Sequence, residues 1–194
     1  MKNFNKILNI FVCILSLSLN SYAQEEDKEF VIDSTIFKKG SNWISISAGT
    51  GYNYGLKTQE TNADVSLQLQ IKKVCLQTGY HISSDEFFLN RSLQKLNDFH
   101  LGVGVRSENT LTNFAVFGGP SYSFGSSYDG YNSDSIKTYK GFGTLGFYSD
   151  VQFTYKLFYD VGLGISLYSS LSKNYQVIGV QVHLYFSGAY KGRI

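Results

Sequence analysis

The last third of the sequence has a two-residue hydrophobic rhythm that predicts three consecutive β-strands between Gly141 and Phe186. In residues 178–186, for example, Ile, Val, Val, Leu and Phe occupy every second position, and Gly, Gln, His and Tyr stand between them. Successive side chains of a strand point to opposite faces of its sheet. Each predicted strand therefore has one apolar face and one face of small and polar side chains.

The same rhythm predicts five further strands earlier in the chain, at 42–54, 64–72, 74–83, 98–107 and 112–124. Gly118-Gly119-Pro120 interrupts the last of them. Because proline cannot donate to a ladder and glycine often marks a bulge, we expect a local irregularity there. The total is eight strands, and the sequence after residue 23 has no amphipathic helical stripe of useful length.

The predicted connections alternate in length along the chain. Longer ones are expected near 53–63, 84–97 and 125–140, short ones at 72–73, 107–111 and 156–158, and a modest one at 170–174. Short turns on one rim and longer loops on the other are typical of a transmembrane β-barrel, and only full closure removes sheet edges inside lipid. The pattern predicts an all-β fold, an eight-stranded antiparallel up-and-down transmembrane β-barrel.

The composition of the two faces indicates which one points outward. The polar face consists mostly of Gly, Ser, Gln and Thr, which suits the narrow interior of an eight-stranded barrel better than a water-exposed surface. Aromatic residues of the apolar face gather near both rims, as they do at membrane interfaces. We place Tyr52, Tyr80, Phe99, Tyr122 and Phe124 near the long-loop rim, and Phe114, Phe153, Tyr155, Tyr159 and Phe186 near the short-turn rim.

The amino-terminal segment resembles a secretory signal peptide. Lys2 and Lys6 precede an apolar run, 7–19, and the small-x-small sequence Ser21-Tyr22-Ala23 follows it. We expect cleavage after Ala23, giving a signal peptide at 1–23, a flexible periplasmic lead-in at 24–41, the barrel at 42–186 and a carboxyl-terminal tail at 187–194. The predicted localisation is the cell outer membrane.

Charge and cysteine content exclude several classes of protein. The chain has 17 basic and 15 acidic residues, and removing Lys2 and Lys6 leaves 15 of each. A neutral mature chain argues against binding to nucleic acid. Cys75 would be the only cysteine after cleavage, so no intrachain disulfide is expected, and we interpret Cys75 as a small buried residue.

The chain resembles the OmpX/OmpA-type barrel domain family, the small outer-membrane β-barrels of Gram-negative bacteria. The signal-like segment, the Phe117-Gly118-Gly119-Pro120-Ser121-Tyr122 strand, the closing Gly-rich strands and the sequence 180–186, Val-Gln-Val-His-Leu-Tyr-Phe, carry the resemblance over about residues 42–186. It implies a barrel in contact with outer-membrane lipids and inserted by the barrel-assembly machinery.

Candidate chemistry is sparse on the predicted inner face. His81 and His100 are the only weak candidates for a metal site, and because a catalytic zinc needs three protein ligands we expect no metal and no cofactor. No serine-plus-acid pair is evident beside His183, so we expect no enzyme activity. The remaining polar and charged residues of the expected lumen are Asp64, Lys72, Arg106, Asp150, Lys156 and Asp160, which would pair and fill a narrow interior.

The expected role is structural or interactive at the cell surface, with a filled lumen and no general pore. Tyr128, Tyr131 and Tyr139 lie in a Gly/Ser/Tyr-rich segment that could bind an extracellular ligand through the loops. Two alternatives stay open at this point: a secreted or periplasmic lipocalin-like barrel that binds an apolar ligand, and a lipid-modifying outer-membrane enzyme.

Overall fold

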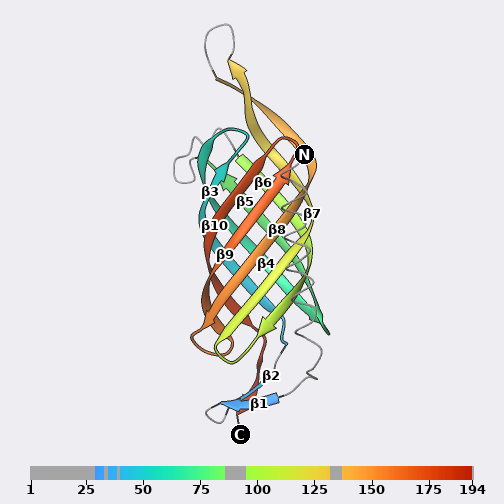
Figure 1. Cartoon of the computed structure of the whole chain (residues 1–194), viewed down its shortest axis with the longest axis vertical. Coiled ribbons are helices and arrows are strands. Elements are labelled where there is room, and N and C mark those ends of the chain that lie inside the picture. The colour runs from blue at the N-terminus through green and yellow to red at the C-terminus, as the bar shows by residue number, and fades with distance from the viewer. Residues whose placement is uncertain (1–28, 33–34, 39, 86–94, 132–136, 194) are drawn as a thin grey trace, which may run out of the picture.

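The computed structural model describes residues 29–32, 35–38, 40–85, 95–131 and 137–193. The described chain is all-β, and eight of its strands form a closed antiparallel barrel in the order β10-β3-β4-β5-β6-β7-β8-β9 (Figure 1). The predicted fold class is confirmed. Among the described residues there is no helix long and apolar enough to cross a membrane.

Each barrel strand pairs with its neighbours in sequence, and the first and last strands close the cylinder. Trp43 lies opposite Ser187, and Asn53 lies opposite Val177, along this closing ladder. The barrel strands are β3 (Trp43–Asn53), β4 (Thr58–Ile71), β5 (Val74–Ser84), β6 (Lys95–Glu108), β7 (Thr112–Tyr131), β8 (Lys137–Lys156), β9 (Val161–Ser172) and β10 (Gln176–Ser187).

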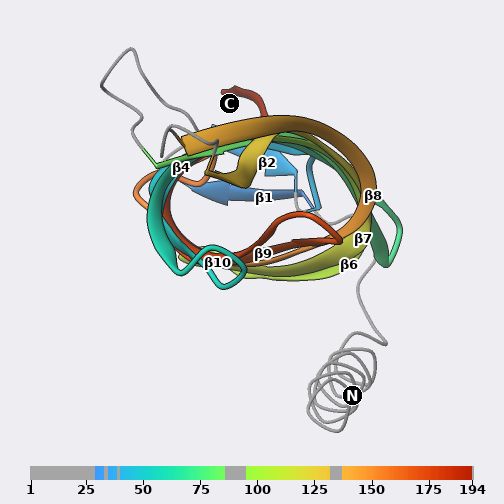
Figure 2. The same cartoon turned by 90° about the horizontal axis from the view of Figure 1, so that it is seen from above.

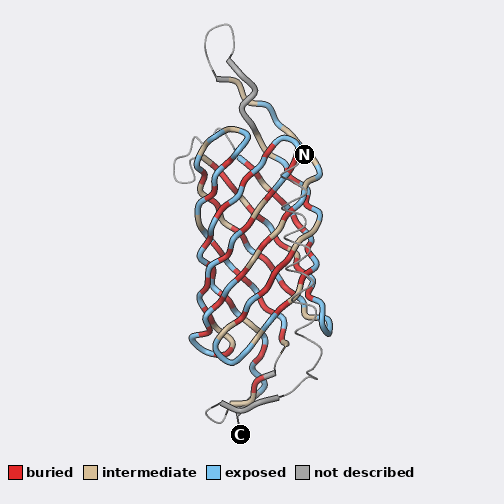
Figure 3. The backbone as a smooth tube through the Cα atoms, viewed as in Figure 1, coloured by how far each residue is buried: buried red, intermediate tan, exposed pale blue. Residues whose placement is uncertain are grey.

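Burial alternates residue by residue along the barrel strands (Figure 3). In β10 the pattern from Val177 to Tyr185 is strictly buried then exposed, with Gln181 and His183 inside and Val182 and Leu184 outside. Large apolar side chains cover the outside of the cylinder, and polar side chains dominate the inside. The predicted assignment of faces is therefore the one that the structure has.

Two local predictions differ from the structure, and a third is confirmed in part. The connection near 53–63 is short, because β4 begins at Thr58. The segment 125–140 is mostly strand, because β7 and β8 extend to Tyr131 and from Lys137, as a hairpin that rises above the rest of the barrel (Figure 1). The irregularity expected at Pro120 is present as an interruption of the β6–β7 ladder, between the pairs His100–Ser121 and Val103–Gly118, without a register shift. The register shift of β7 lies farther along the strand, between Tyr128 and Gly130.

A second, three-stranded sheet forms from the two flanks of the barrel. Its order is β1-β2-β11, from strands β1 (Glu29–Ile32), β2 (Thr35–Lys38) and β11 (Tyr190–Arg193). We name it the cap sheet, because it lies beneath the short-turn mouth (Figure 1), where β1 and β2 fall within the barrel outline when seen from above (Figure 2). The lead-in 24–41 was predicted to be flexible and the tail 187–194 to be a separate segment, and where they are described they pair with each other.

Hydrogen bonds and ring contacts attach the cap sheet to the barrel. Gly188 N–H donates to the carbonyl oxygen of Asn42 over 2.9 Å, so the chain entering the barrel and the chain leaving it run side by side. The ring of Phe37 lies 5.1 Å from that of Tyr159, centroid to centroid. Tyr159 is therefore buried under the mouth, and its predicted place among the outward aromatic residues is wrong.

Candidate functional site

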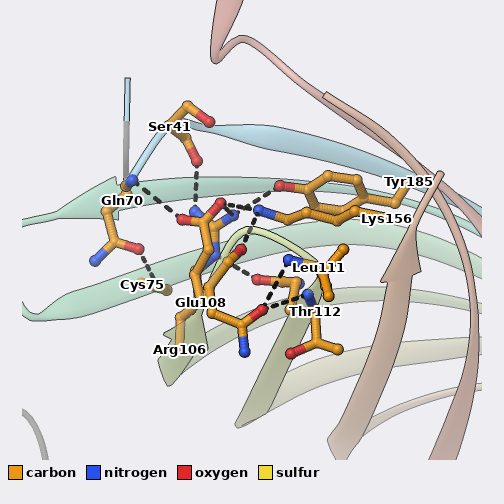
Figure 4. Close-up of polar contacts among 12 residues, drawn as sticks. Ser41, Gln70, Cys75, Arg106, Glu108, Leu111, Thr112, Lys156 and Tyr185 are labelled. Atoms are coloured by element: carbon orange, nitrogen blue, oxygen red, sulfur yellow. Dashed lines mark hydrogen bonds and ion pairs between the residues drawn. The ribbon is translucent and has the colours of Figure 1, made fainter. Parts of the chain in front are cut away.

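The lower end of the lumen contains a cluster of buried charges on β6 and β8 (Figure 4). Arg106 Nη2 lies 3.0 Å from Glu108 Oε1. The other guanidinium nitrogens donate to Asn113 Oδ1 over 2.5 Å and to the carbonyl oxygen of Ser41 over 2.8 Å, and Nη2 also donates to the Tyr185 hydroxyl over 2.7 Å. Every nitrogen of this buried guanidinium therefore has an acceptor.

Lys156 approaches the same carboxylate from β8. Its Nζ atom forms an ion pair with Glu108 and donates to the carbonyl oxygen of Asn109 over 3.1 Å. Glu108 also accepts from the backbone N–H of Gly40 over 3.1 Å, which links this cluster to the chain that leads into the barrel. Two cations thus share one carboxylate, and the ring of Tyr159, 3.7 Å from Lys156 Nζ, provides further stabilisation for the second cation.

An aromatic cluster fills the lumen beside these charges. Trp43 packs against Phe117 and Tyr185, with ring centroids 6.0 and 6.2 Å away, and Arg106 lies over its indole at 4.2 Å. Cys75 is fully buried in the same cluster, as predicted, and its thiol donates to Gln70 Oε1 over 2.9 Å. Aromatic and charged side chains are therefore packed together inside the lower lumen.

Buried acids lie higher in the barrel. Asp150 accepts from the amides of Gln77 and Gln152, over 3.1 and 2.6 Å, through one oxygen only. Asp98 accepts from the hydroxyls of Ser123 and Ser170, also through one oxygen. The second oxygen of each carboxylate has no hydrogen-bond partner within the described residues, and neither acid forms an ion pair with a described Lys or Arg.

The structure brings His81 and His100 to adjacent strands inside the upper lumen. His100 stacks on Tyr148 with a centroid distance of 3.8 Å, and its Nε2 atom lies 3.9 Å from the carboxylate of Asp64. His81 packs against Tyr168 at 4.5 Å. No group of three His, Cys, Asp or Glu side chains in the described part of the chain could hold a metal ion.

His183 lies apart from the other two imidazoles. Its Nε2 atom is 2.8 Å from the Thr154 hydroxyl, and it is buried in the lumen. Across the described ranges, none of the three imidazoles hydrogen-bonds a serine hydroxyl or a carboxylate. The arrangement contains no nucleophile activated by a base and an orienting acid, which hydrolytic chemistry requires.

A second apolar cluster, of Leu96, Tyr148, Tyr168, Tyr175 and Val177, lies in the upper lumen. Tyr175, in the β9–β10 turn, donates its hydroxyl to the buried carboxylate of Glu60, which also accepts from Asn53 over 2.9 Å and Ser83 over 2.7 Å. Burial and then the charge of Glu60 raise the pKa of Tyr175 above its ordinary value.

The other predicted site residues lie at the rims. Asp160 is in the β8–β9 turn and not on an inner strand face, because β9 begins one residue later, and Lys72 is exposed in the β4–β5 turn. Tyr139 is partly buried on β8. Tyr128 and Tyr131 end β7, and their side chains lie outside the described set.

Sequence reasoning missed several buried residues that organise the lumen. Asp98 and Glu108 lie an even number of residues from His100 and Arg106 along β6, so they share the strand face that was predicted to point inward. Glu60 has the parity of Asp64 along β4. Asp98 already begins the predicted strand 98–107, and extending the alternation to Glu108 and to Glu60 would have placed these two inside as well.

Solved structures share this architecture. Neisserial surface protein A matches with a TM-score of 0.54 and 10% sequence identity, over 75% of this chain and 95% of its own. This chain shares the fold of small outer-membrane β-barrels. The N-terminal β-barrel domain of Pseudomonas aeruginosa OprF (TM-score 0.50, 14% identity, 76% of this chain and 100% of that one) and Ail, the attachment invasion locus protein of Yersinia pestis (0.51, 8%, 77% and 95%), also match.

The resemblance predicted from sequence is thus confirmed at the level of the fold. No protein-family model matches the sequence, and no curated protein matches it either. At these identities the likeness to solved structures concerns the fold alone.

Proposed function

We propose that the chain is an outer-membrane barrel with a filled lumen, which acts as a structural or binding element of the cell surface and not as a general pore or an enzyme. One observation carries the proposal: apolar side chains cover the outside of the closed cylinder while polar side chains are buried inside it. Apolar outer walls suit lipid, and a closed ladder satisfies the backbone there.

The same observation disfavours a lipocalin-like barrel, because an apolar ligand would need an apolar interior. It also disfavours a pore, because the Trp43 and Tyr168 clusters occupy the lumen at two levels. The signal-like segment 1–23 supports export, with lipids and the barrel-assembly machinery as partners. The raised β7–β8 hairpin provides the surface on which an extracellular ligand would bind.

Membrane insertion is tested by extracting membrane fractions with carbonate and comparing gel mobility in SDS before and after heating. A carbonate-resistant band whose mobility changes only on boiling is the expected result. A carbonate-soluble chain without a heat shift would contradict the proposal. Conductance of planar bilayers containing the purified barrel tests the filled lumen, and stable single-channel steps would show it to be open.

The surface role is tested by shortening the hairpin. Ser127 and Lys140 are ladder partners, so joining them through Asn-Gly removes 128–139 and leaves the pairing below unchanged. Cells that carry the shortened barrel should adhere less to serum-protein-coated glass than cells with the full chain, at equal heat-shifted amounts. Equal adhesion of the two kinds of cell would contradict a binding role of the hairpin and would favour the structural role.

A further inference from the structure

The turns of the short-turn rim differ in chemistry around the barrel. Leu111 in the β6–β7 turn is 57% exposed, and Leu157 and Phe158 in the β8–β9 turn are 62% and 72% exposed. The β4–β5 turn consists of two exposed lysines, Lys72 and Lys73. In the barrel order, β4–β5 and β8–β9 lie four strands apart, on opposite sides of the cylinder.

The two apolar turns are neighbours. Lys156 N–H donates to the carbonyl oxygen of Leu111 over 2.8 Å, so the end of β8 lies against the β6–β7 turn. Leu111, Leu157 and Phe158 thus form one exposed surface, which we name the turn patch. Water-exposed apolar clusters of this kind mark contacts with lipid or protein.

The fold of the β8–β9 turn determines which of its side chains face outward. Phe158 and Val161 exchange backbone hydrogen bonds of 3.0 and 3.3 Å, which closes the turn tightly. Tyr159 turns inward to Phe37, while its neighbour Phe158 stays outside. The hydrogen bonds of the turn and the contact of Tyr159 with Phe37 therefore hold Phe158 in its exposed position.

The turn patch continues the apolar outer wall of the barrel. Tyr155 ends the outward face of β8 directly above it, and Leu163 lies opposite Tyr155 on β9. Both side chains are about half exposed. No polar outward residue of β8 separates Tyr155 from Leu157, since Lys156 points inside.

From this continuity we propose that the turn patch is immersed in the membrane leaflet, so that the barrel sits deeper, or tilted, on its β6–β9 side. The inference rests on the proposed membrane insertion. The lipid that covers Tyr155 and Leu163 would also cover Leu157 and Phe158, because the apolar surface is continuous between them. On the opposite side, Lys72 and Lys73 hold their ammonium groups at the headgroups, where charged side chains are stable.

The single tryptophan of the chain makes the inference testable by depth-dependent fluorescence quenching. Trp43 is 1% exposed and lies inside the lumen, so the unmodified barrel provides a background that lipid does not reach. The added emission of Phe158→Trp, Lys73→Trp and Ile165→Trp is measured in phosphatidylcholine vesicles with brominated acyl chains. Ile165 lies on the lipid-facing side of β9 and is the positive control.

We expect Phe158→Trp and Ile165→Trp to lose most of their added emission, and Lys73→Trp to keep most of it. If only Ile165→Trp is quenched, the barrel is inserted but the turn patch lies outside the lipid, and the inference is overturned. If Ile165→Trp is not quenched either, membrane insertion itself fails. Quenching of Phe158→Trp that disappears as protein is added at fixed lipid would assign the patch to contact between copies instead.

Discussion

The imidazole of His183 lies directly over Gly164, its partner in the β9–β10 ladder. A Cβ atom on Gly164 would stand 2.5 Å from His183 Nε2 and 2.2 Å from the carbonyl oxygen of Phe153. Because glycine has no side chain, the imidazole ring can pack against the backbone at this position. His100 lies over Gly79 in the same way across the β5–β6 ladder.

The first prediction concerns this packing. Gly164→Ala should lower the free energy of unfolding by about 2 kcal/mol, because a buried side chain and a backbone carbonyl would both have to move. Gly141→Ala is the matched control, since its Cβ would meet nothing nearer than the Gly125 carbonyl oxygen at 3.8 Å. Urea unfolding of barrels refolded into vesicles measures both, and equal effects would contradict the packing argument.

Removing the carboxylate from the lower cluster should destabilise the barrel strongly. Glu108→Gln removes the carboxylate that Arg106 and Lys156 share, and breaking a buried ion pair in this way costs about 3 kcal/mol or more. Asp160→Asn, at the same rim but partly exposed, should change stability by less than about 0.5 kcal/mol. A Glu108→Gln variant as stable as the control would show that the aromatic rings suffice for both cations.

The buried acids should respond in the opposite way. Asp98→Asn keeps an oxygen for the hydroxyls of Ser123 and Ser170 and removes a buried charge that has no cation beside it among the described residues. We expect the free energy of unfolding at neutral pH to rise by about 1 kcal/mol. Asp98→Ala should lower it, because both hydroxyls lose their acceptor. The same urea titration distinguishes the two, and a fall in both variants would show that the charge itself is stabilising.

The contact between Tyr175 and Glu60 predicts a dependence on alkaline pH. Since the pKa of Tyr175 is raised in the folded barrel, the neutral phenol contributes stability that is complete below the ordinary tyrosine pKa of about 10 and is lost above it. Tyr175→Phe should cost about 1 kcal/mol at pH 7, where Glu60 loses a donor. The difference from the unmodified chain should shrink between pH 10 and 11, in unfolding measured at each pH in that range. A constant difference would contradict this account.

The period-two pattern was sufficient to predict the barrel, its strand order and the direction of its faces. It failed where both faces of a strand are polar. Thr58–Asn62 begins β4 above the apolar wall, and because both of its faces are polar the pattern predicts a loop there. The pattern also does not predict the arms of the β7–β8 hairpin, because the Gly and Ser residues there do not alternate with apolar residues.

The lumen was predictable in composition but not in its contacts. Parity placed Asp64, Arg106, Asp150 and His183 on the inner face, where the structure has them. Which cation meets which acid depends on contacts across the barrel, between strands that are not neighbours in sequence. The ion pair of Lys156 with Glu108 joins β8 to β6, and nothing in either strand alone indicates it.

The pairing of β2 with β11 has a consequence for the order of assembly. These strands lie at opposite ends of the chain, so bringing them together in an open chain would carry the loop-closure entropy of nearly its whole length. Once β3 and β10 have paired, Asn42 and Gly188 are already in contact, so the entropy cost of closing the loop has been incurred in forming the barrel. We therefore expect the pairing of β2 with β11 to form late, on a cylinder already sealed, and protection of the β11 amides against hydrogen exchange would mark the moment of closure.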